Sequence, residues 1–159
     1  QDIIADKKVC HLGCAEGFIL AKMLMLGASE GIGIDIRWGN NWKVTKNYVS
    51  SAGIEKKLSC RTGDYLKEPL PEADVYYSWS SPSHLEALLE NIFDKRPDFN
   101  GINIMSFTKF GVTIPAQYIK TTEAYEKFGG EVRIKRSPCD TFEIGLWIIS
   151  AEEYRKNKT

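Results

Sequence analysis

A glycine-rich turn near the start of this 159-residue chain is the stretch best suited to contacting a ligand. Residues 8–12, Lys-Val-Cys-His-Leu, form a short apolar run, and Gly13-Cys14-Ala15-Glu16-Gly17 follows at once. Glycine lets the backbone approach a ligand closely, and a helix beginning after Gly17 offers unpaired N–H groups at its start. The pattern therefore predicts a strand, a tight turn and a helix, with the ligand at the turn.

This stretch resembles motif I of the class I S-adenosylmethionine-dependent methyltransferases, whose usual form is acid-x-Gly-x-Gly-x-Gly. Gly13, Ala15 and Gly17 fall on the glycine positions, and His11 falls on the position of the acid. A dinucleotide-binding loop would place its third glycine at position 18, which is Phe18 here. The spacing therefore favours the methyltransferase loop, and a nucleotide-dependent oxidoreductase is kept as an alternative.

The elements that must position this turn predict an α/β fold. Apolar, strand-like runs occupy about 7–12, 31–36, 57–61, 73–79, 101–106, 131–137 and 141–150, and helix-length segments about 16–26, 40–52, 83–93 and 115–128. This alternation predicts a mostly parallel sheet. The last two strands are separated by only a few residues, so they should pair as an antiparallel hairpin. The charged tail from Ala151 on is expected to fray.

The resemblance covers nearly the whole chain and implies a three-layer sandwich. Its seven-stranded, mostly parallel sheet would have the order 3-2-1-4-5-7-6, with strand 7 antiparallel and helices on both faces. We expect a single cofactor-binding domain over residues 1–159. Few residues precede the first strand, and the chain opens with Gln1 rather than Met. An upstream N-terminal segment is therefore expected to be missing.

Composition and charge narrow the classes of partner. The chain carries 21 basic and 21 acidic residues, so its formal net charge is zero. This balance argues against a broad nucleic-acid-binding face. The sequence has no signal peptide and no apolar run of about 18 residues, which predicts a cytoplasmic protein without a membrane partner.

The four cysteines form no paired C-x-x-C sets and no Cys/His cluster. Cys10 and Cys14 straddle the glycine-rich turn, but small buried thiols in a reducing compartment are the better interpretation than a metal or redox pair. No metal site is predicted.

The resemblance assigns the cofactor S-adenosyl-L-methionine to residues of several loops. Asp35 ends the second strand, and a carboxylate there can accept two hydrogen bonds from a ribose diol. Ile36 would supply an apolar wall for the adenine ring, and Asp64 would bind the adenine amino group. Gly63-Asp64 is also an ordinary turn signal, but Asp64 falls in register after Asp35, so the cofactor role is favoured. The full predicted cofactor set is His11, Gly13, Cys14, Ala15, Gly17, Asp35, Ile36, Asp64, Tyr65 and Ser78.

His11 departs from the family pattern. The acid that usually stands there helps to hold the amino-acid moiety of the cofactor. His11 either reaches this moiety through water or packs beside Cys10, and both interpretations stay open.

The segment after the fourth strand indicates the class of acceptor. Enzymes that methylate amino groups of bases or of glutamine usually carry Asp/Asn-Pro-Pro-Tyr there, whereas this chain has Trp-Ser-Ser-Pro at 79–82. The segment looks more like the small-molecule branch, whose pattern is matched by Asp74, Ser78, His84 and Leu85. In that branch His84 would act as a proton acceptor, with Ser80 as a second candidate catalytic residue. A solvent-exposed histidine at a helix start is the alternative.

These observations predict a methyltransferase that moves a methyl group to O, N or S of a small molecule by metal-independent, in-line transfer. The short connections after strands four and five predict an open acceptor side, to be completed by the missing segment, a second subunit or a large substrate. Two alternatives remain. One is a methyltransferase-fold binding or scaffold protein without catalysis, and the other is a protein or nucleic-acid methyltransferase that needs a partner.

Overall fold

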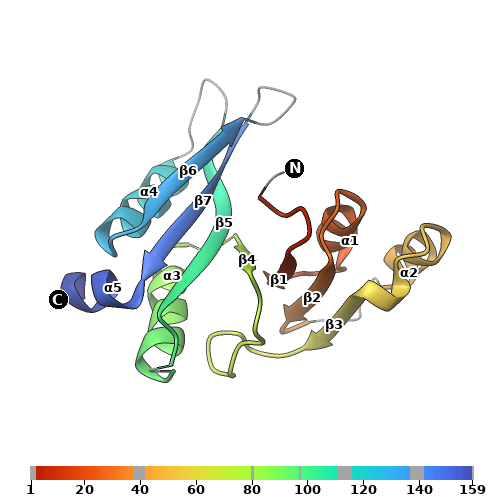
Figure 1. Cartoon of the computed structure of the whole chain (residues 1–159), viewed down its shortest axis with the longest axis horizontal. Coiled ribbons are helices and arrows are strands. Elements are labelled where there is room, and N and C mark those ends of the chain that lie inside the picture. Colours follow the sequence, from red (N-terminus) through yellow and green to blue (C-terminus); the bar gives the residue numbers. More distant parts are fainter. Residues whose placement is uncertain are drawn as a thin grey trace. The chain divides into compact units, whose positions relative to one another are not determined.

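Strands and helices alternate along the chain, and the strands are hydrogen-bonded in the order β3-β2-β1-β4-β5-β7-β6 (Figure 1). The computed structural model describes residues 3–37, 42–79, 81–96, 98–110, 116–136 and 142–158. The chain divides into two compact units, Gln1–Tyr77 and Ser78–Thr159. The predicted α/β fold with a mixed sheet is confirmed.

The first unit is built on parallel strands. Its elements are β1 (Lys8–Leu12), α1 (Phe18–Met25), β2 (Glu30–Asp35), α2 (Trp42–Ser51), a short 3-10 turn (Glu55–Lys57) and β3 (Leu58–Thr62). The boundary between the units falls within β4 (Val75–Ser78), after Tyr77. β2 pairs in parallel with β1 on one side and with β3 on the other. The carboxyl ends of β1 and β2 therefore lie side by side, and the loops that follow them share one edge of the sheet.

Two glycines of β2 let its neighbours come close. A Cβ atom at Gly31 would lie 3.0 Å from Cγ of Leu20, so α1 packs directly on the strand backbone. Gly33 stands in register between His11 of β1 and Cys60 of β3. The core of this unit is made by fully or almost fully buried side chains, which include Val9, Cys10, Leu12, Leu20, Ala21 and Ile34.

The second unit joins helices to antiparallel strands. Its elements are α3 (Pro82–Leu89), a π-helical turn (Glu90–Asp94), β5 (Gly101–Phe110), α4 (Ala116–Lys127), β6 (Glu131–Arg136), β7 (Phe142–Ser150) and α5 (Ala151–Asn157). β7 runs antiparallel to both β5 and β6, which confirms the predicted hairpin. In its core the rings of Tyr125 and Trp147 stack with centroids 4.8 Å apart.

The C-terminal tail is a helix, so the expectation that it frays from Ala151 on is wrong. The Ser150 hydroxyl accepts a hydrogen bond from the Glu153 N–H at 3.1 Å, which caps α5. Tyr154 is fully buried, and its ring packs against Phe93 and Phe128. The helix is therefore held by an N-terminal cap and by an aromatic anchor.

Truncating that anchor should destabilise the protein. We expect Tyr154→Ala to lower the free energy of unfolding by about 3–5 kcal/mol, because it leaves a cavity lined by two aromatic rings. The exposed neighbour gives a matched control, and Arg155→Ala should change stability by less than about 0.5 kcal/mol. Urea unfolding measures the free energy of unfolding of the wild-type protein and of both variants. A loss below about 1 kcal/mol for Tyr154→Ala would mean that α5 is not anchored as described.

Candidate cofactor-binding site

The glycine-rich loop between β1 and α1 has an alternating left-handed backbone. Gly13, Ala15 and Gly17 have φ values of 79°, 47° and 76°. Glycine adopts this region freely, but an alanine there is strained by about 1–2 kcal/mol. The loop is closed internally by a hydrogen bond from the Gly17 N–H to the Cys14 carbonyl at 2.8 Å.

Asp35 holds this loop from the end of β2. Its Oδ2 accepts a hydrogen bond from the Ala15 N–H at 2.9 Å, and its Oδ1 accepts one from the Arg37 N–H at 2.8 Å. The neighbouring Ile34 carbonyl accepts hydrogen bonds from the Gly13 and Cys14 N–H groups at 2.8 and 3.2 Å. Hydrogen bonds to a carboxylate are stronger than those between neutral groups. Ala15, the strained residue of the loop, is the loop residue that makes such a bond with Asp35.

The structure brings most of the predicted cofactor residues of the first unit together. A Cβ atom at Gly13 would lie 3.9 Å from Cε1 of Tyr65, so the tyrosine ring lies beside the loop. Ile36 follows Asp35 and is 67% exposed, which leaves its side chain open to contact. The loop, the carboxylate, one aromatic ring and one apolar side chain therefore share the carboxyl edge of β1 and β2.

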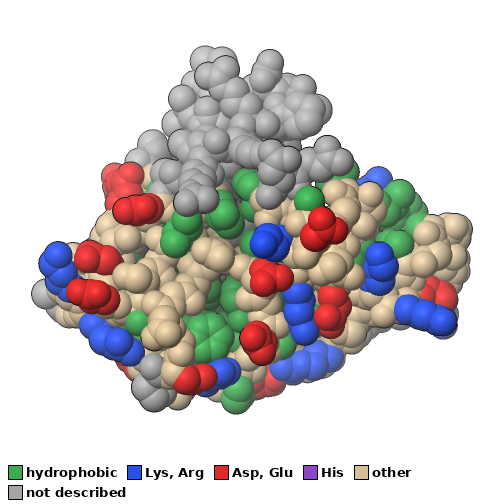
Figure 2. Space-filling model, in the orientation of Figure 1, with side chains coloured by type: hydrophobic (Ala, Val, Ile, Leu, Met, Phe, Trp, Pro, Cys, Tyr) green, Lys and Arg blue, Asp and Glu red, His purple; other side chains and the backbone are tan. Residues whose placement is uncertain are grey.

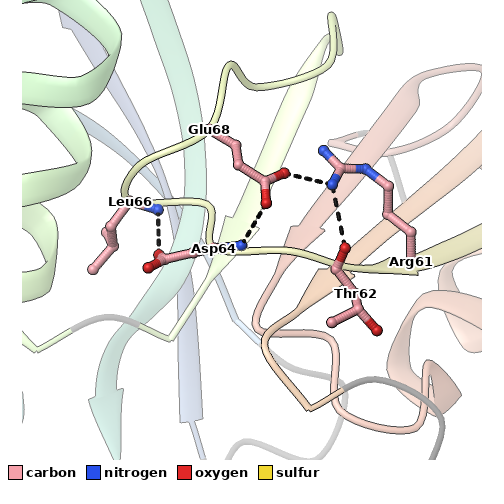
Figure 3. Close-up of polar contacts among 5 residues, drawn as sticks. All are labelled: Arg61, Thr62, Asp64, Leu66 and Glu68. Carbon is pink, nitrogen blue, oxygen red and sulfur yellow. Dashed lines mark hydrogen bonds and ion pairs between the residues drawn. The ribbon is translucent and has the colours of Figure 1, made fainter.

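The Asp64 carboxylate is engaged in hydrogen bonding within a local turn (Figure 3). Its Oδ1 accepts a hydrogen bond from the Leu66 N–H at 3.1 Å, and its Oδ2 pairs with Nζ of Lys67 at 3.1 Å. The Lys67 ammonium, with the Leu66 N–H, lowers the pKa of Asp64. The Asp64 N–H in turn donates to Glu68, whose carboxylate also pairs with Arg61 at 2.6 Å. These contacts agree with the interpretation of Gly63-Asp64 as an ordinary turn.

His11 is a buried, neutral histidine. It is 4% exposed, and its ring contacts the Tyr77 ring edge-on with centroids 4.7 Å apart. Burial lowers the pKa of His11 to about 4, although the Asp35 carboxylate opposes this shift. Among the described residues Nδ1 has no hydrogen-bond partner. The imidazole therefore brings no charge to the site at neutral pH, unlike the acid usually found at this position of the family motif.

Sequence reasoning missed a second cysteine beside the loop. A Cβ atom at Gly33 would lie 2.7 Å from Sγ of Cys14 and 2.7 Å from Sγ of Cys60. The two thiols therefore meet over Gly33, a strand residue that has no side chain to separate them. The only sequence signal for this is the glycine itself, since nothing local links the two cysteines.

The predicted acceptor-side residues belong to the second unit. The Ser81 hydroxyl accepts a hydrogen bond from the His84 N–H at 3.4 Å and caps α3, where Pro82 takes the first helical position. The His84 side chain is exposed, and Ser78 is fully buried. Ser80 lies outside the described residues.

Within the described ranges no group of three or more His, Cys, Asp or Glu side chains could hold a metal ion. No helix in that part of the chain has the length and apolar character needed to cross a membrane. Figure 2 shows acidic and basic side chains intermingled on the face that it presents.

Comparison with known proteins identifies the fold. No family model and no curated protein matches the sequence. Among solved structures, the pyocyanin biosynthetic protein PhzM superposes with a TM-score of 0.64 and 14% identity over 92% of this chain and 51% of its own. An RNA methyltransferase from Salinibacter ruber, solved with S-adenosyl-L-homocysteine, gives 0.62 and 21% identity over 94% of this chain and 84% of its own.

A third match is the O-methyltransferase NcsB1 of neocarzinostatin biosynthesis, with a TM-score of 0.61 and 15% identity over 90% of this chain and 48% of its own. The chain thus has the Rossmann-like fold of the class I S-adenosylmethionine-dependent methyltransferases. The chain spans about half the length of PhzM and about half the length of a further match, the dimethyltransferase RosA from Streptomyces davawensis.

The buried histidine makes a pH-dependent prediction. In the unfolded chain a histidine has a pKa of about 6.5, whereas folded His11 has a pKa of about 4. The unfolded state therefore binds more protons between these values, and the free energy of unfolding should fall by roughly 1 kcal/mol per unit as pH drops through that window.

Urea unfolding between pH 7 and 4, compared with the variant His11→Gln, tests this prediction. The wild-type protein should lose more stability than the variant as the pH falls. Equal pH dependence in the two proteins would contradict a buried, neutral His11.

Proposed function

We propose that the protein binds S-adenosyl-L-methionine at the Gly13–Gly17 loop and transfers its methyl group to O, N or S of an acceptor. One observation carries the proposal, namely the left-handed loop held by the Asp35 carboxylate at the carboxyl edge of β1 and β2. The strand order coincides with the order implied by the family resemblance, and this agreement supports the proposal. Several structures of the same fold contain S-adenosylmethionine or S-adenosyl-L-homocysteine.

Asp35 would bind the ribose hydroxyls of the cofactor. An ionised carboxylate has about four acceptor positions, and here two backbone N–H groups use one on each oxygen. The remaining lone pairs can accept from a diol while the loop stays in place. Ile36 and Tyr65 would flank the adenosine, with Cys14 and Gly17 contributing backbone and His11 and Ser78 completing the predicted set. Asp64 would make a smaller contribution, because its carboxylate already serves a turn.

The chemical step needs little from the protein. The sulfonium of the cofactor makes the methyl carbon electrophilic, so the chain must align an attacking atom in line and accept a proton. Orientation alone lowers such a barrier by several kcal/mol. His84 is our candidate proton acceptor, because its side chain is exposed at the start of α3. Ser80 is the second candidate, and no metal ion is needed.

A small-molecule acceptor is favoured over a macromolecule. The chain lacks the Asp/Asn-Pro-Pro-Tyr pattern, and its net charge is zero. NcsB1, which has the same fold, was solved with 2-hydroxy-5-methyl naphthoic acid. A nucleic-acid substrate is the alternative, because an RNA methyltransferase from Salinibacter ruber has the same fold. We propose a single domain in the cytoplasm, with an acceptor side completed by an upstream segment or by a second subunit.

Calorimetric titration with S-adenosyl-L-homocysteine tests cofactor binding without requiring an acceptor. We expect saturable binding by the wild-type protein and a loss of roughly 30- to 1000-fold in affinity for Asp35→Ala, which removes two charge-assisted hydrogen bonds, or roughly 2–4 kcal/mol. Asp64→Ala is the matched control and should lose less. Circular dichroism should show that both variants are folded.

Two results would overturn this proposal. The first is absence of heat and of a thermal shift at about 1 mM cofactor, a concentration at the upper end of the usual range of KM values, about 1 μM to 1 mM. The second is a greater loss for Asp64→Ala than for Asp35→Ala, which would reverse the assigned roles. Binding without turnover against any acceptor panel would favour the non-catalytic scaffold instead.

A further inference from the structure

Two thiols from separate segments converge on the loop that the proposed cofactor site uses. Cys14 lies in the loop between β1 and α1, and Cys60 lies in β3. Both sulfurs are 2.7 Å from the position that a Cβ atom of Gly33 would occupy. They are therefore no more than twice that distance apart, and the missing side chain of Gly33 is what admits both. Both cysteines are free thiols.

The backbone keeps the pair together. Gly33 and Cys60 are direct partners in the parallel pairing of β2 with β3. On the other side, the Cys14 N–H donates to the Ile34 carbonyl of β2 at 3.2 Å. The backbone of each cysteine is thus hydrogen-bonded or paired to β2. The two sulfurs are therefore brought together by the backbone and not by movement of a flexible side chain.

The two thiols differ in exposure and in reactivity. Cys14 is 3% exposed, whereas Cys60 is partly exposed and can be reached by a small oxidant. A hydrogen bond from the Cys14 thiol, helped by the Gly33 N–H, lowers the pKa of Cys60, and the same pairing and burial raise the pKa of Cys14. Cys10 is fully buried, and burial raises its pKa to about 12. Cys60, which is partly exposed and has the lowered pKa, is therefore the most reactive thiol of the three described cysteines.

We propose that Cys14 and Cys60 form a reversible disulfide when the protein meets hydrogen peroxide. The Cys60 thiolate attacks one peroxide oxygen, an S–O bond forms, the O–O bond breaks, and the leaving hydroxide takes a proton to become water. The Cys14 sulfur then attacks the Cys60 sulfenic acid, so that an S–S bond forms, the S–O bond breaks, and the Cys14 proton leaves in a second water. Two thiols lose two electrons, and one peroxide becomes two waters.

The disulfide would tether the cofactor loop to β3. An S–S bond is about 2.05 Å long, so the sulfurs must approach each other to form it. Cys14 lies between Gly13 and Ala15, and its movement would displace the N–H groups that line the loop. This consequence rests on the proposed cofactor site, and we expect the oxidised protein to bind S-adenosyl-L-homocysteine about tenfold more weakly than the reduced protein.

Peptide mapping tests the disulfide independently of cofactor binding. The full chain is treated with hydrogen peroxide, blocked with N-ethylmaleimide and digested with trypsin without reduction. The expected product joins the peptide of residues 9–22 to the peptide of residues 58–61, and dithiothreitol separates them. Sulfinic acid at Cys60 without a cross-link, or a cross-link to the peptide of residues 137–155 that carries Cys139, would overturn the proposal.

Two variants identify the cysteines involved. The peptide of residues 9–22 contains both Cys10 and Cys14, so the cross-link should persist in Cys10→Ala and disappear in Cys60→Ser. Loss of the cross-link in Cys10→Ala would assign the bond to Cys10 and would overturn the proposal. If Cys60→Ser does not fold, fragmentation of the wild-type cross-linked peptide still distinguishes position 10 from position 14.

Calorimetry then separates the two proposals. If the reduced protein does not bind S-adenosyl-L-homocysteine but the cross-link forms, the proposed function fails and the thiol pair stands. If the reduced protein binds and oxidation weakens binding about tenfold in wild type but not in Cys60→Ser, the coupling of the pair to the loop is supported. Equal affinities of reduced and fully cross-linked protein would refute that coupling.

Discussion

The hydrogen bond from the Ala15 N–H to the Asp35 carboxylate is the interaction on which the site depends. It joins the loop after β1 to the end of β2, at the edge where both parallel strands finish. Ala15 has a backbone conformation that costs an L-residue about 1–2 kcal/mol. A charge-assisted bond contributes a comparable amount, so the strained loop persists because Asp35 holds it. The Ile34 carbonyl, which binds two further loop N–H groups, strengthens the same connection.

Much of the fold could be predicted from the sequence because its signals are local. Apolar runs separated by Gly27 and Gly53 marked the early strands and helices, and the short link after β6 marked the hairpin. The error at α5 arose because the high charge of the tail outweighed a local cap signal. Ser150 and Glu153 have the spacing of a helix cap, but the burial of Tyr154 depends on aromatic rings from two other elements.

The site was predicted only in part, for a related reason. The glycine spacing and Asp35 follow from the order of strand, turn and helix, which sequence shows directly. That Asp64 serves a turn depends on Leu66 and Lys67 lying in contact with its carboxylate. The meeting of Cys14 with Cys60 depends on strand register, which no local pattern reveals. Contacts set by register or by side-chain direction therefore remained beyond sequence reasoning.

The conformation of Ala15 bears on how such loops are recognised in genomes. A motif written in amino-acid letters records this position as a departure from glycine. Written as backbone dihedral angles, positions 13, 15 and 17 are equivalent, and all three are left-handed. The middle one tolerates a methyl group where a carboxylate from the next strand accepts its N–H. A search pattern that pairs a small residue with an acid at the end of the following strand would recover chains that a strict glycine pattern overlooks.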